Sequence, residues 1–97
     1  MDTKYNMNTN EINNKLFEYI LAEVFGYGGD GDCLIVCKGK NALELGKLFF
    51  DFIINKYNNY YLDIYDWGLI VSDRSNESWT FTNNQEIPDW ANFVIRV

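Results

Sequence analysis

The chain has 97 residues, of which 47% are hydrophobic and 18% aromatic, and its fourteen acidic and eight basic residues give a net charge of −6. This length accommodates a single domain, 1–97, and excludes two. The aromatic content excludes disorder over most of the chain. The acidic balance argues against direct contact with nucleic acid or an anionic membrane and favours a basic partner, although charge of this size also serves solubility alone.

The first residues of the chain are polar. Segment 1–8 is predicted to be a loose N-terminal arm, and it lacks the apolar core of a signal peptide. No stretch approaches the roughly 18 apolar residues that a membrane helix requires. We therefore expect a cytoplasmic protein, in a cell or in a host cell taken over by a virus.

A helix is predicted over residues 10–25, and the glycine-rich segment 26–32 ends it. This segment spells G-x-G-x-x-G, but a dinucleotide-binding loop follows a strand and opens a helix, which is the reverse of the order here. Asp30 and Asp32 would repel a phosphate, and they supply only a fragment of a calcium loop. We expect a turn that holds neither cofactor nor metal. The helix is inferred from apolar residues at three- and four-residue spacing: Ile12, Leu16, Phe17, Ile20, Leu21, Val24 and Phe25.

Residues 33–37, Cys-Leu-Ile-Val-Cys, are continuously apolar, which predicts a central strand covered on both faces. Four residues along a strand span about 13 Å. Cys33 and Cys37 are therefore too far apart to form a disulfide with each other. They are predicted to be buried free thiols, as in a reducing compartment.

After a turn at 39–40, a second helix is predicted over residues 42–57, with Asn41 as its cap and Glu44 completing a variant of the capping box. Gly46 costs about 1 kcal/mol inside a helix. It is therefore expected to mark a close approach of this helix to the sheet. The predicted apolar side consists of Leu45, Leu48, Phe49, Phe52, Ile53 and Tyr57.

The remaining sequence predicts four strands, at 60–66, 69–71, 79–81 and 93–97, with 72–78 as a polar hairpin loop. The order is helix, strand, helix and then four strands. We expect an α+β domain in which two helices cover one face of a mostly antiparallel sheet of about five strands.

Catalytic patterns are missing from the sequence. The chain has no histidine, no nucleophile-elbow serine and no phosphate loop, and its two cysteines have no adjacent base. Paired carboxylates such as Asp63 and Asp66 carry little information in so acidic a chain. We predict that the protein is not an enzyme; an enzyme that uses carboxylates alone is the alternative.

A candidate binding surface lies in the second half of the chain. Residues 57–97 hold six acidic residues and only two arginines, for a net charge of −4, against −2 for residues 1–56. Strand 60–66 alternates, so that if Leu62 and Ile64 face the core, the aromatic and acidic residues between them face outward. Exposed tyrosine and tryptophan are typical of binding hot spots. The predicted partner-binding residues are Tyr61, Asp63, Tyr65, Asp66, Trp67, Asp73 and Glu77.

Two details of this surface stay open at this stage. The same aromatic residues would be hidden if the first helix packed on them as a second layer. Trp79, Glu86, Asp89 and Trp90 would extend the surface, and Arg74 is expected to bridge to one of its acids.

In its length, acidity and lack of enzymatic motifs, the whole chain resembles the small acidic inhibitors of phages and other mobile elements, including anti-CRISPR proteins. The resemblance rests on composition and carries over no individual residue. It implies a non-enzymatic inhibitor that presents carboxylates to a basic nucleic-acid-binding effector, in part by imitating nucleic-acid phosphates. Two alternatives remain: an immunity protein or antitoxin that neutralises a basic toxin, and a structural or assembly factor that forms homodimers or larger homo-oligomers through its aromatic strand.

Overall fold

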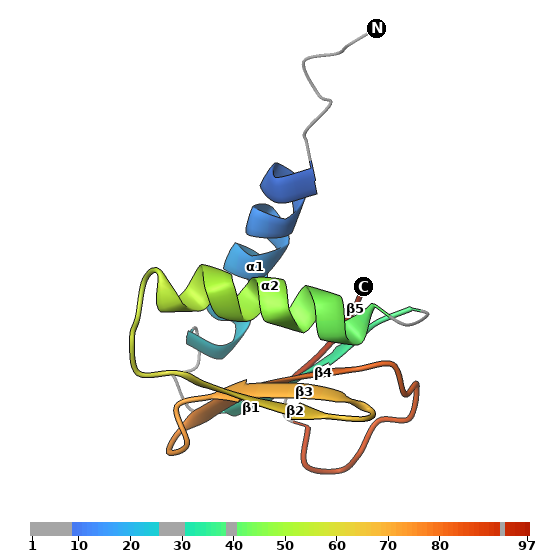
Figure 1. Cartoon of the computed structure of the whole chain (residues 1–97). Coiled ribbons are helices and arrows are strands. Elements are labelled where there is room, and N and C mark those ends of the chain that lie inside the picture. Colours follow the sequence, from blue (N-terminus) through green and yellow to red (C-terminus); the bar gives the residue numbers. More distant parts are fainter. Residues whose placement is uncertain (1–8, 26–30, 39–40, 92) are drawn as a thin grey trace, which may run out of the picture.

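The computed structural model of the protein describes residues 9–25, 31–38, 41–91 and 93–97. Two helices and five strands follow one another in the order expected from the sequence (Figure 1). The expected arm at 1–8, most of the turn at 26–32 and the turn at 39–40 lie outside the described residues. The elements are α1 Thr9–Phe25, β1 Gly31–Val36, α2 Ala42–Ile54, β2 Tyr61–Tyr65, β3 Gly68–Ser72, β4 Glu77–Thr82 and β5 Phe93–Arg96.

The five strands form one mixed sheet in the order β2-β3-β4-β1-β5. β2, β3 and β4 are antiparallel neighbours, whereas β1 pairs in parallel with both β4 and β5. The expectation of a mostly antiparallel sheet is therefore wrong. α2 carries the chain back to the end of the sheet where β1 began, and the long connection between β4 and β5 does the same. Each strand after such a crossover runs in the direction of the strand before it.

Both helices lie on the same face of the sheet, as expected (Figure 1). Every second strand residue points towards them, because side chains alternate along a strand. Phe49 of α2 lies at the centre of this core, with its ring centroid 5.4 Å from Phe17, 5.3 Å from Trp79 and 5.4 Å from Phe81. The indole N–H of Trp79 donates to the backbone oxygen of Ile20 in α1, at 3.4 Å. The aromatic residues thus join both helices to β4.

α2 differs in detail from the expectation. It ends at Ile54 instead of residue 57, and Tyr57 and Leu48 are exposed, although both were expected on the apolar side. Asn41 does occupy the N-cap position, but its side chain makes no capping hydrogen bond. The Asn83 side chain accepts the Ala42 N–H instead, at 3.2 Å, so the helix start is fixed by a residue distant in sequence.

The connection from β4 to β5 crosses the sheet on the face opposite the helices (Figure 1). It has to pass β1, because β1 lies between β4 and β5. Its Gln85 side chain donates to the backbone oxygen of Cys37, at 3.3 Å, which ties it to the end of β1. Two apolar β1 side chains on this face, Leu34 and Val36, are buried, as expected for a strand covered on both sides.

None of the described helices has the length and apolar character needed to cross a membrane.

Gly46 is a point of close approach between α2 and the sheet, as predicted. A Cβ atom at this position would lie only 2.7 Å from Cγ of Leu69, which is fully buried. Gly46→Ala should therefore destabilise the protein by about 1–2 kcal/mol, because the overpacking penalty exceeds the gain in helix propensity. Urea unfolding would measure the change.

Lys47→Ala, at the adjacent exposed position, should change stability by less than about 0.5 kcal/mol and serves as the control. In a Leu69→Val background, which shortens the opposing side chain, the penalty of Gly46→Ala should shrink. A Gly46→Ala variant as stable as the wild type would contradict the proposed contact.

Cys33 and Cys37 are buried free cysteines on the helix side of β1. Burial raises the pKa of Cys33 to about 12, with a further contribution from the charge of Glu23, and burial raises the pKa of Cys37 to about 11. Since the thiolate is the reactive form, both thiols should react with a disulfide reagent at pH 8 at least about a hundredfold more slowly than free cysteine, and Cys33 more slowly than Cys37. Absorbance stopped-flow would measure the rate, and unfolding in urea should restore it; fast labelling of the folded protein would disprove this burial.

Candidate functional site

The face of the sheet opposite the helices is the candidate site, and we call it the open face. Its members follow from the strand register, in which Leu34 lies beside Thr80, Thr80 beside Ile70 and Ile70 beside Asp63. Since side chains alternate, the residues two positions away along each strand share this face. The open face comprises Asp32, Leu34, Val36, Tyr61, Asp63, Tyr65, Ile70, Ser72, Ser78, Thr80, Thr82, Val94 and Arg96.

Three of the predicted residues, Tyr61, Asp63 and Tyr65, lie side by side in β2 on the open face. Tyr61 and Tyr65 are 47% and 45% exposed, so both point outward, a question that the sequence left open. The competing interpretation, in which the first helix covers these aromatics, is wrong, because α1 lies on the other face (Figure 1). On that other face Leu62 packs against the core, but Ile64 is exposed instead of buried.

Asp66 and Trp67 form the two-residue turn between β2 and β3. Trp67 remains 42% exposed, and its ring stacks on Tyr65 with centroids 5.1 Å apart and planes only 5° apart. Gly68 makes this tight turn possible, because its φ is +153° and a Cβ atom there would collide with the backbone oxygen of Phe81. The turn therefore holds the Trp67 indole at the rim of the open face.

Arg74 bridges to an acid of the surface, as expected, and that acid is Asp63. The closest nitrogen–oxygen distance is 3.5 Å, and both side chains are largely exposed. The guanidinium also lies over the ring of Tyr61, 4.2 Å from its centroid. Exposed ion pairs contribute at most about 1 kcal/mol. Arg74 shows that the open face can hold an arginine between an aromatic ring, that of Tyr61, and a carboxylate, that of Asp63.

Asp73 lies in the turn between β3 and β4, whereas Glu77 is the first residue of β4, where side-chain alternation places it on the side of Trp79 and not on the open face. The Asp73 carboxylate accepts the backbone N–H groups of Ser75, Asn76 and Glu77 at 2.9–3.1 Å. Its partial burial acts to raise the pKa of Asp73, but these hydrogen bonds outweigh that effect and hold the pKa below its ordinary value. Asp73 therefore organises the turn, and its predicted role in binding is joined by a structural one. An aspartate at the start of a polar turn was the sequence signal for this role.

Of the residues that were expected to extend the surface, the structure excludes one. Trp79 is fully buried in the core against Phe49 and Tyr60. The alternation of residues 78–82 carried that signal, since Trp79 and Phe81 fall on one side and the polar residues on the other. Glu86, Asp89 and Trp90 are exposed in the connection between β4 and β5.

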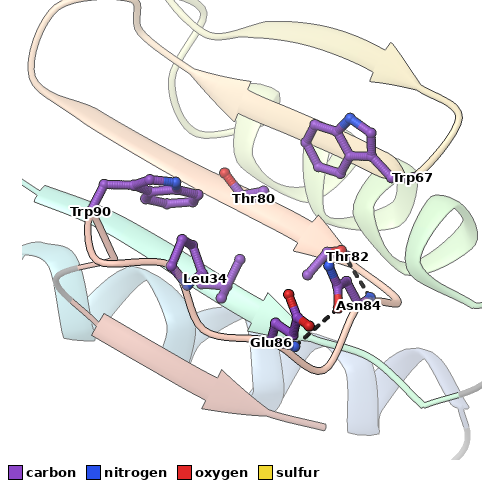
Figure 2. Close-up of a pocket in the computed structure, with 8 residues that line it drawn as sticks. Leu34, Trp67, Thr80, Thr82, Asn84, Glu86 and Trp90 are labelled. Atoms are coloured by element: carbon purple, nitrogen blue, oxygen red, sulfur yellow. Dashed lines mark hydrogen bonds between the residues drawn. The ribbon is translucent and has the colours of Figure 1, made fainter.

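A hollow of about 200 Å³ lies in the open face beneath this connection, and we call it the trough (Figure 2). Figure 2 shows the Trp67 and Trp90 indoles on either side of Thr80, and the carboxylate of Glu86 beside Thr82 and Asn84. Sequence reasoning missed the trough, because it brings together residues from β1, β4, a turn and a long connection. Its lining residues are Leu34, Trp67, Thr80, Thr82, Asn84, Glu86, Pro88 and Trp90.

Charge is distributed unevenly between the two layers. In the described part of the chain, the helices and the residues flanking α2 carry five acids and four lysines, whereas the strands and connections of the sheet carry seven acids and two arginines. The helix layer has Glu11, Glu18, Glu23, Glu44, Asp51, Lys15, Lys38, Lys47 and Lys56; the sheet layer has Asp32, Asp63, Asp66, Asp73, Glu77, Glu86, Asp89, Arg74 and Arg96.

The described residues contain no group of three or more histidine, cysteine, aspartate or glutamate side chains that could hold a metal ion. The Ser78 hydroxyl donates to Asp32 on the open face, at 2.7 Å. The G-x-G-x-x-G residues 26–30, including Asp30, lie outside the described residues.

Comparison with protein-family models, with curated proteins and with solved structures finds no match for this chain.

Asp73→Ala should destabilise the protein by about 1–2 kcal/mol at pH 7, because three backbone N–H groups lose their acceptor. Asp73→Asn, which keeps an acceptor oxygen, should cost less, and Asp89→Ala should change stability little. Since the pKa of folded Asp73 lies below the ordinary 3.8, its contribution is complete above that pH and is lost as the pH falls through the folded value. Urea unfolding at several pH values would test this: the difference between wild type and Asp73→Ala should shrink as the pH falls below 3.8, and a difference that did not change with pH would contradict the role of the charge.

Proposed function

We propose that this protein is a non-enzymatic inhibitor whose open face binds a basic surface of a nucleic-acid-binding effector. The observation that carries the proposal is that the sheet has helices on one face only (Figure 1). The other face presents acidic and aromatic side chains, including Asp63 and the exposed Tyr61 and Tyr65. The part of this face that the β4–β5 connection leaves exposed, around Tyr61 and Tyr65, is a surface suited to a partner.

Electrostatics supports a basic partner. Seven of the twelve described acidic residues belong to the sheet layer, where only two arginines oppose them, so the field outside this layer is negative. Proteins that bind DNA present lysine and arginine to a phosphate spaced every ~1.7 Å along the helix axis. Carboxylates on the open face can occupy such a surface and thereby keep nucleic acid from it.

Aromatic exposure supports a protein partner. Tyr61, Tyr65, Trp67 and Trp90 are between 42% and 48% exposed, and tyrosine and tryptophan are the residues most enriched in binding hot spots. Their rings bury a large area on contact and lose little conformational entropy. The acids supply long-range attraction, and the aromatics supply the contact area that makes a complex last.

The same acidic and aromatic residues could bind a basic toxin. The immunity-protein or antitoxin hypothesis therefore differs from this proposal only in the identity of the effector. Self-assembly fits the observations less well. A two-fold contact between two open faces would set acidic surfaces against each other, which costs free energy unless cations intervene.

The test uses two variants with equal loss of charge. Asp63→Asn, Asp66→Asn and Glu86→Gln together remove three charges from the sheet layer, and Glu18→Gln, Glu44→Gln and Asp51→Asn together remove three from the helix layer. Each protein would be immobilised and exposed to purified basic nucleases and ribonuclease toxins at 50 mM and 300 mM salt. We expect the sheet variant to bind at least about tenfold more weakly than the wild type at low salt.

The helix variant should keep at least about half of the wild-type affinity, and the bound effector should lose its nuclease activity at an equimolar ratio. If both variants weaken binding equally, the attraction is non-specific and the open face is not the site. A wild-type protein that sediments as a stable oligomer and binds no effector would favour the assembly factor.

A further inference from the structure

We infer that the trough holds an arginine side chain of the partner. The inference rests on the proposed function and adds to it the kind of residue that anchors the complex. Its basis is the combination of aromatic walls, an apolar floor and one carboxylate in a hollow that has the volume of a single large side chain (Figure 2).

Stacking holds one of the two aromatic walls, Trp67, in place. Tyr65 covers one face of the Trp67 indole by stacking on it, so that only the other face and the edges of that ring can meet a ligand. Trp90 is 48% exposed on the opposite side of Thr80. Leu34, which is buried beneath them, and Pro88 offer apolar surface for the methylene stem of a long side chain.

The carboxylate comes from Glu86, whose position follows from a chain of short-range hydrogen bonds. The Asn84 N–H donates to the Thr82 hydroxyl at 3.0 Å, and the Glu86 N–H donates to the Asn84 side-chain oxygen at 3.0 Å (Figure 2). These bonds connect Glu86 to the end of β4. Among the described residues that line the trough, Glu86 is the one charged group, so the trough favours a cation.

The open face shows the same recognition chemistry within the molecule. Arg74 lies 4.2 Å from the centroid of the Tyr61 ring while its guanidinium pairs with Asp63 at 3.5 Å. Ring and carboxylate thus already hold one arginine on this face. The trough repeats that combination with two indoles and Glu86, but no arginine of the described chain lines it.

Arginine fits this combination better than lysine or a nucleobase does. A guanidinium is planar, stacks on aromatic faces and gives up its water more readily than an ammonium group. A nucleobase would bring a phosphate backbone towards the seven acids of the sheet layer. The partner is therefore expected to present an arginine that projects from its basic surface.

The test uses three peptides with the sequence acetyl-Gly-Gly-Ser-X-Ser-Gly-Gly-amide, in which X is arginine, lysine or citrulline. Their ends are capped, so the central residue X is the one position that can carry a charge. Citrulline has the shape of arginine without its charge, and lysine has the charge without the plane. Each peptide would be titrated into the full-length ¹⁵N-labelled protein at 50 mM salt, and amide and indole N–H shifts would be followed. The arginine peptide should shift the indole signals of Trp67 and Trp90 and bind about threefold to tenfold more tightly than either control.

Two variants locate the site. Glu86→Gln and Trp90→Ala change exposed residues and should each weaken binding of the arginine peptide about threefold or more, whereas Asp51→Asn on α2 should leave it unchanged. The amide spectrum of each variant reports whether it is folded. Equal affinity for the three peptides, or shifts that avoid the trough, would overturn the arginine site.

The two proposals can fail separately. If basic effectors depend on the acids of the open face but the three peptides bind alike, the arginine site is overturned and the proposed function stands. Arginine-selective shifts in the trough support the arginine site even if no effector is affected by the sheet variant, and that second result would overturn the proposed function.

Discussion

The packing of α2 against the sheet is the contact on which the rest of the structure depends. Phe49 inserts between Phe17 of α1 and the Trp79 and Phe81 rings of β4, and Gly46 lets the helix approach Leu69 of β3. This one interface commits alternate residues of the strands to the core, because side chains alternate along a strand. The other residues are thereby assigned to the open face. The residues that form the core therefore also determine which acidic and aromatic residues of the strands lie on the opposite face.

Topology then shapes the open face into a site. β1 lies between β4 and β5, so the connection joining β4 to β5 must cross β1 over one of the two faces. The helices occupy the first face, and the connection crosses the second (Figure 1). The β1–β2 crossover runs over the helix face towards one edge, and the β4–β5 crossover runs over the open face towards the other edge, so both have the same hand, as parallel crossovers do. The trough forms where this connection passes above Leu34 and Thr80.

Charge and contact are divided between different parts of this surface. Asp73 stays charged but its oxygen is occupied by its own turn, and Asp63 pairs with Arg74. Asp66 in the β2–β3 turn and Glu86 in the β4–β5 connection add negative charge beside the exposed aromatic residues. These residues flank the exposed indoles of Trp67 and Trp90. The acidic residues that attract a basic partner and the aromatic residues that it would bury thus lie at the same end of the open face, beside the trough.

Sequence patterns were enough to predict the order of the elements, the burial of both cysteines and the close approach at Gly46, but they left open whether Tyr61 and Tyr65 face outward. Each of these predictions follows from the local spacing of residue types, because the periods of helices and strands decide which residues share a side. The folded structure was needed to show that β1 runs parallel to its neighbours, that Asn83 instead of Asn41 receives the first N–H of α2, and that Glu86 and Trp90 join Leu34 around a trough. These features join residues far apart in the chain. They depend on how much apolar surface the whole folded sheet buries, and a local sequence pattern carries no information about that total.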